Sequence, residues 1–160
     1  MTVVTAPSAQ LARASVIASL VAGLPAGLLA RVAMAIIGAA GGTSMMATVG
    51  QHTLAGTIRI VIVPMLFGIP FVALLLWAGH RLWGGRPMVV RVVAYAVGAM
   101  VMPGLLFLTD AEFNLTGPNQ EIGRLAFVPA FLVYGAVAGL VGEWFMRRTP
   151  RVKAAPDPTP

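Results

Sequence analysis

The chain has 160 residues, of which 58% are hydrophobic and only 10% are charged. Soluble domains carry about 25% charged residues, so this composition excludes an ordinary soluble domain and is typical of an integral membrane protein. The formal net charge of +6 would suggest nucleic acid in a soluble protein. Here the basic residues flank apolar runs, as in loops on the cytoplasmic face of a membrane, and we expect no nucleic-acid partner. The absence of cysteine excludes disulfides and thiolate metal sites.

Four apolar segments are each long enough to cross a bilayer, which takes about 20 residues. They predict an all-α fold, an antiparallel bundle of four transmembrane helices over about residues 14–40, 54–78, 89–108 and 123–146. We expect a disordered lead over residues 1–12, a membrane domain over residues 13–146, and a basic, proline-rich tail over residues 147–160. The first segment could instead be a signal peptide, but its apolar run exceeds the usual length of about 7–15 residues. A retained span is therefore favoured.

The basic residues predict the orientation of the chain in the membrane. If the chain crosses four times, eight of them fall on one side: Arg13, Arg81, Arg86, Arg91, Arg147, Arg148, Arg151 and Lys153. This is a positive-inside pattern, which places both termini and the middle loop in the cytoplasm. Three tryptophans, at positions 77, 83 and 144, lie at the same ends of their spans, where indole rings favour the membrane interface. We therefore expect a protein of the cytoplasmic membrane with the loop 109–122 outside. The excess of arginine over lysine is common in bacterial proteins, so we expect a bacterial source.

Charged residues predicted at the outer face form the main candidate site. A charge inside a span costs roughly 2.5–3.5 kcal/mol or more at its centre and is a functional candidate. The set comprises Arg31 and Arg59 within spans, Asp110, Glu112 and Glu121 in the loop, and Arg124 at the edge of the fourth span. These residues could form a structural clasp or the wall of an anion-accepting pocket. Alternatively, the two span arginines could extend to the headgroups without a partner.

Glu143 is the one carboxylate predicted inside a span. It precedes Arg147 by four residues, so an ion pair on one helix face explains it; proton coupling in a transporter is the alternative. Gly23 with Gly27, and Gly135 with Gly139, fit the small-xxx-small pattern of close helix packing. The two histidines fall on opposite predicted faces, so we expect no metal and no haem or other cofactor.

No motif in the sequence indicates a particular activity. The leading hypothesis is a non-enzymatic accessory, scaffolding or lipid-interacting component of the membrane, with the bilayer and a second copy or another membrane protein as partners. A small homo-oligomeric transporter or channel is the alternative, because four short spans seldom enclose a path alone. An enzyme acting on a lipid-like substrate, with the outer charges as acid, base or oxyanion partner, ranks third.

Overall fold

The computed structural model describes residues 8–39, 54–109 and 120–148, with side chains described except at 37–38, 102–109 and 120–124. These residues form four α-helices: α1 (Ser8–Ala39), α3 (Leu54–Trp83), α4 (Met88–Thr109) and α5 (Gln120–Arg148). The prediction of an all-α fold with four helices is therefore confirmed. Three of the helices are long and apolar enough to cross a membrane, and the described side chains of α4 add a shorter apolar segment, Met88–Val101.

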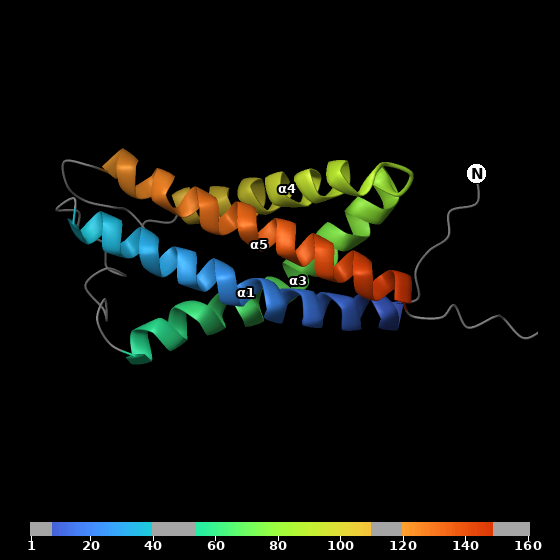
Figure 1. The fold of residues 1–160 in the computed structure, drawn as a ribbon, viewed down its shortest axis with the longest axis horizontal. Coiled ribbons are helices and arrows are strands. Elements are labelled where there is room, and N and C mark those ends of the chain that lie inside the picture. The colour runs from blue at the N-terminus through green and yellow to red at the C-terminus, as the bar shows by residue number, and fades with distance from the viewer. Residues whose placement is uncertain (1–7, 40–53, 110–119, 149–160) are drawn as a thin grey trace, which may run out of the picture.

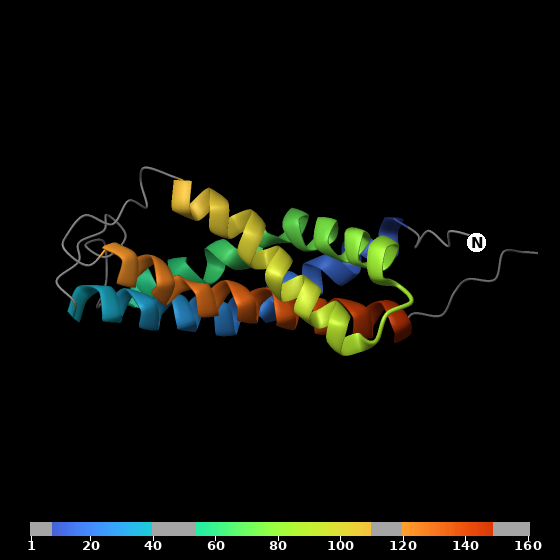
Figure 2. The same cartoon turned by 90° about the horizontal axis from the view of Figure 1, so that it is seen from above.

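The four helices run alternately up and down along one long axis (Figure 1). Helix α1 packs between α3 and α5, and α4 packs mainly on α5, so that α1 and α4 do not touch over the described residues. Helix α3 runs obliquely to the others in Figure 1, and α4 runs obliquely in the view from above (Figure 2). The two helices approach each other near the turn that joins them. The beginning of α1, the α3–α4 turn and the end of α5 therefore share one end of the bundle, which we call the basic end because its exposed side chains include Arg81, Arg86 and Arg148.

The packing of α1 follows from a four-residue repeat of small side chains. Residues 14–27 contain the pairs Ala-Ser, Ala-Ser, Ala-Gly and Ala-Gly at four-residue intervals, and all eight of these residues are buried. Residues four apart lie above one another on a helix, so the repeat builds two adjacent narrow ridges. Large side chains at the same interval, Leu20, Leu24 and Leu28, lie on the opposite, exposed side. Small ridges allow close backbone approach, which drives helix association in lipid.

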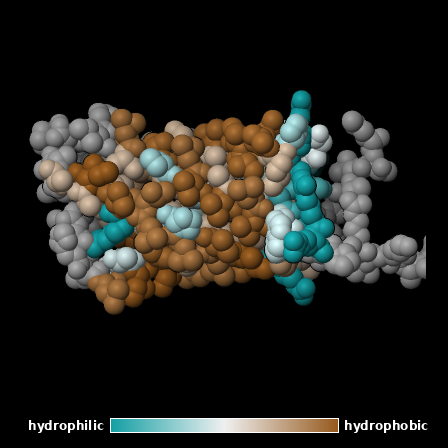
Figure 3. Space-filling view, viewed as in Figure 1, coloured by the Kyte–Doolittle hydropathy of each residue, from teal (hydrophilic) through white to brown (hydrophobic). Residues whose placement is uncertain are grey.

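The outer surface of the bundle is a broad apolar belt. Figure 3 shows hydrophobic residues over most of its length and a hydrophilic strip at the basic end. Leucine, valine and phenylalanine side chains are exposed along the helices, among them Phe67 at 78%. A soluble monomer rarely exposes so large a continuous apolar surface, whereas lipid tails cover such a surface at no cost. Three of the four described helices also have the length and apolar composition that crossing a membrane requires.

Candidate functional site

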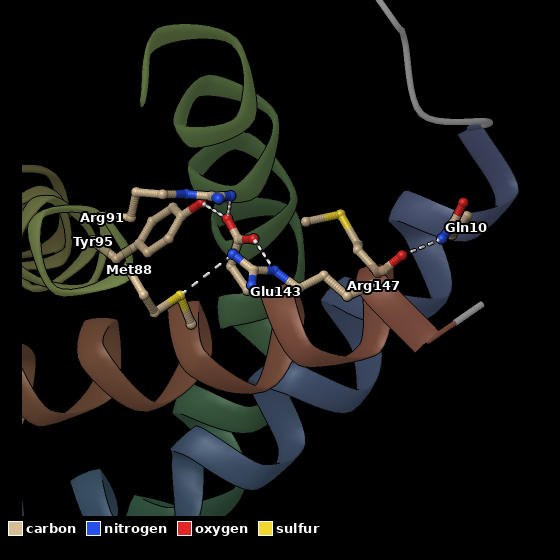
Figure 4. Close-up of polar contacts among 7 residues, drawn as sticks. Gln10, Met88, Arg91, Tyr95, Glu143 and Arg147 are labelled. Atoms are coloured by element: carbon tan, nitrogen blue, oxygen red, sulfur yellow. Dashed lines mark hydrogen bonds and ion pairs between the residues drawn. The ribbon is translucent and has the colours of Figure 1, made fainter. Parts of the chain in front are cut away.

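A buried ion pair joins α4 to α5 close to the basic end (Figure 4). The guanidinium of Arg91 contacts the carboxylate of Glu143, and their side chains are only 5% and 3% exposed. The hydroxyl of Tyr95 donates a hydrogen bond of 2.7 Å to the same carboxylate oxygen, Oε1 of Glu143. Because Arg91 and Tyr95 lie one helical turn apart on α4, both reach the single carboxylate that α5 presents.

Glycines on two helices make room for the ring of Tyr95. A Cβ atom at Gly139 of α5 would lie 2.7 Å from Cγ of Tyr95, and one at Gly79 of α3 would meet the other edge of the ring. Tyr95 is 1% exposed. The ring thus fills a slot between α3 and α5, and this packing fixes the direction in which its hydroxyl points. The carboxylate of Glu143 therefore accepts a hydrogen bond from a hydroxyl whose position is set by the packing of Tyr95 among α3, α4 and α5.

The charges of this cluster do not balance by themselves. Nε of Arg147 lies 3.8 Å from Oε2 of Glu143, so one carboxylate faces two guanidinium groups. The side chain of Arg147 is 61% exposed, so its charge remains accessible from outside the bundle. Nε of Arg91 is buried without a hydrogen-bond partner among the described residues. Arg91 consequently depends on Glu143 for its compensation, since moving a bare charge out of water costs several kcal/mol.

Arg91 is one of the eight basic residues that the positive-inside pattern assigns to the cytoplasmic side, but it does not lie in the turn between α3 and α4. Arg91 lies in the first turn of α4, is 4% exposed and points into the bundle. The sequence contains a signal for this position, because Arg91, Tyr95 and Ala99 recur at four-residue intervals and so share one face of the helix. The structure shows that all three are buried. The predicted pair of Glu143 with Arg147 is present, but the buried partner of Glu143 is Arg91.

A second polar cluster fastens α1, α3 and α5 near the middle of α3. The hydroxyl of Ser19 donates to the Met65 carbonyl at 2.8 Å and lies 2.7 Å from the Tyr134 hydroxyl. Tyr134 in turn reaches the Pro64 carbonyl at 3.2 Å. Gly68 leaves the space that the Tyr134 hydroxyl occupies. Each hydroxyl has a single proton to donate, so when Ser19 donates to the Met65 carbonyl, Tyr134 donates either to Ser19 or to the Pro64 carbonyl.

Replacing Tyr134 with phenylalanine should lower the stability of the bundle by roughly 0.6 kcal/mol and by at most about 1.7 kcal/mol, the mean and the maximum measured for interhelical hydrogen bonds in a membrane protein. The change removes one oxygen atom and leaves the ring in place. Ser19→Ala should cost a similar amount, and the double variant should cost less than the sum because the two hydroxyls share one bond. Equilibrium unfolding in mixed detergent micelles measures all three. Strict additivity would contradict the shared bond.

The predicted outer-face cluster is only partly within the described residues. Arg59 is exposed on α3, and Arg31 is half-buried on α1. Asp110 and Glu112 lie outside the described residues, as do the side chains of Glu121 and Arg124. The clasp or pocket at that end therefore stays a prediction. The four packing glycines all lie at helix contacts: Gly23 and Gly27 against Met65 and Val61, and Gly135 and Gly139 against α4.

Within the described part of the chain, no three histidine, cysteine or acidic residues gather in a way that could hold a metal ion. The chemistry of the site is thus that of two interhelical polar clusters and a basic end. A search with protein-family models finds no match to this chain, and no curated protein and no solved structure matches it either.

Proposed function

We propose that the chain is a non-enzymatic component of the cytoplasmic membrane, a rigid four-helix platform on which lipid or another membrane protein assembles. The observation that carries this proposal is that the carboxylate of Glu143 is bound by side chains of its own bundle. Glu143 is the one acidic residue whose side chain the structure describes, and Arg91, Tyr95 and Arg147 all contact it. Its role is to hold α4 and α5 together.

Proton-coupled transport is the second candidate, and the burial of Glu143 is what favours it. A buried carboxylate in a span is a common element of proton pathways. A carrier must release its carboxylate from one partner in each cycle, however, and here the carboxylate contacts two arginines and a tyrosine at the same time. This arrangement favours a permanent pair over a group that binds and releases a proton.

Proton flux into liposomes distinguishes the two functions. Purified protein is reconstituted into vesicles that contain the pH-sensitive dye pyranine, and a pH gradient is imposed with sodium, potassium or guanidinium as the counter-ion. The platform proposal predicts that the gradient decays as slowly as in protein-free vesicles, for the parent and for Glu143→Gln alike. Faster decay with the parent, abolished by Glu143→Gln in a variant that keeps its helical circular dichroism, would establish transport instead.

A further inference from the structure

The basic end presents exposed positive charge that the described acidic side chain, Glu143, offsets only in part, through its contact with Arg147. Five arginines are exposed there, contributed by α1, the α3–α4 turn and the two helix ends: Arg13, Arg81, Arg86, Arg147 and Arg148. Glu143, the described carboxylate nearest to them, is buried and paired inside the bundle. Contacts between helix ends hold this surface together, since the Gln10 side chain donates to the Met146 carbonyl at 2.9 Å.

Two of the arginines stack on tryptophans at the same spacing on different helices. The guanidinium carbon of Arg148 lies 4.2 Å from the ring centroid of Trp144. On α3, Arg81 lies 5.5 Å from the ring centroid of Trp77. In both cases the arginine follows the tryptophan by four residues, which places it one turn nearer the helix end. The tryptophans are about half exposed, at 51% and 49%.

Stacking prepares a guanidinium for binding a phosphate. The attraction to the face of the indole ring holds the guanidinium over it without using its N–H groups as hydrogen-bond donors to the protein. The edge of the planar guanidinium matches two oxygens of a phosphate in a bidentate pair. Because the indole restrains the arginine side chain beforehand, less conformational entropy is lost when the phosphate binds.

The position of these tryptophan–arginine pairs next to the apolar belt indicates which kind of molecule supplies the phosphate. The hydrophilic strip in Figure 3 adjoins the apolar belt directly. In a bilayer whose acyl chains cover that belt, side chains at the basic end would therefore lie at the level of the headgroups. Tryptophan favours the same level. A phosphate there belongs to a phospholipid whose acyl chains lie along the exposed apolar side chains of the same helix, such as Leu140 on α5 and Leu74 on α3.

We propose that each tryptophan–arginine pair, Trp144 with Arg148 and Trp77 with Arg81, binds the headgroup of one anionic phospholipid of the surrounding bilayer. Zwitterionic lipids bind less well, because their own cationic group competes with the arginine for the phosphate. The pair on α5, which is the more closely stacked, is the stronger site. This inference rests on the proposed function only in that the chain is a membrane-embedded, lipid-contacting platform.

Quenching of tryptophan fluorescence by brominated lipids tests the inference at one site at a time. A variant that keeps only Trp144, with Trp77→Phe and Trp83→Phe, is reconstituted into vesicles of equal parts phosphatidylglycerol and phosphatidylcholine, in which either the first or the second lipid alone is brominated. A basic residue near an anionic surface contributes roughly 1 kcal/mol, so we expect about fivefold preference for the anionic lipid beside Trp144. Arg148→Gln should reduce the preference to near unity, and Arg148→Lys should give an intermediate value, because lysine keeps the charge but loses the planar fork.

Arg59→Gln is the matched control, since Arg59 is exposed on the other half of α3 and should leave the preference at Trp144 unchanged. Equal quenching by the two lipids in the parent would overturn the inference, as would an undiminished preference in Arg148→Gln. If Arg148→Lys shows the same preference for the anionic lipid as the parent, the role assigned to the planar guanidinium of Arg148 would be overturned. The proton-flux result is independent of quenching, so failure of the platform proposal and failure of the lipid sites are separate outcomes.

Discussion

Glu143→Gln is expected to destabilise the bundle by about 3–5 kcal/mol, the cost of removing one partner from a buried ion pair. Glutamine has nearly the same shape as glutamate and still accepts a hydrogen bond from Tyr95. What it removes is the negative charge that compensates Arg91, a side chain only 5% exposed. Equilibrium unfolding in detergent–SDS mixtures, followed by circular dichroism, measures the change.

The reverse change, Arg91→Met, should cost less than Glu143→Gln. Glu143 would retain Arg147, whose Nε lies 3.8 Å away and whose side chain is exposed enough to move closer. Arg148→Gln is the control for loss of an exposed charge, and it should change the stability by less than about 0.5 kcal/mol. An Arg91→Met variant that is less stable than Glu143→Gln would show that Arg147 does not support the carboxylate.

Gly135→Ala should lower stability by about 1–3 kcal/mol, although alanine is the better helix former by about 1 kcal/mol. A Cβ at this position would lie 2.9 Å from Cα of Ala96 and 2.5 Å from Cβ of Ala99. These are backbone and near-backbone atoms of α4, which can move away only if the whole helix shifts. The measurement is again equilibrium unfolding in mixed micelles.

Gly98→Ala is the matched control because Gly98 is also helical and also faces another helix. The atom its Cβ would meet is Cδ2 of Leu75 at 2.8 Å, the far end of a flexible side chain. Helix propensity should then dominate, and Gly98→Ala should be neutral or stabilising by up to about 1 kcal/mol. Destabilisation of the same size in both variants would contradict the close α4–α5 approach at Gly135.

The four helices could be predicted from the sequence because their signal is strong and local. Long apolar runs separated by glycine, proline and charged residues indicate helices in lipid with little ambiguity. The proline positions did not mislead this prediction, because helices α1, α3 and α5 each continue through an internal proline. The four glycines identified by the small-xxx-small pattern all lie at helix contacts.

The partner of Glu143 could not be predicted in the same way. Arg147 is four residues away on the same helix and explains the charge locally, whereas Arg91 is 52 positions earlier and borders a loop rich in arginine. Only the packing of α4 on α5 determines that Arg91 turns inward. The Ser19–Tyr134 cluster was missed for a related reason, because serine and tyrosine are unremarkable in a span until their helices are placed side by side.

A double-mutant cycle on Arg91 and Glu143 tests most directly whether the buried pair locks the bundle. The parent, Arg91→Met, Glu143→Gln and the double variant are unfolded under identical micelle conditions. We predict a favourable coupling energy of roughly 1–3 kcal/mol that exceeds the cost of Arg91→Met. The double variant, which buries no uncompensated charge, should then be more stable than Glu143→Gln alone. A double variant destabilised by the full sum of the two single changes would contradict the predicted coupling.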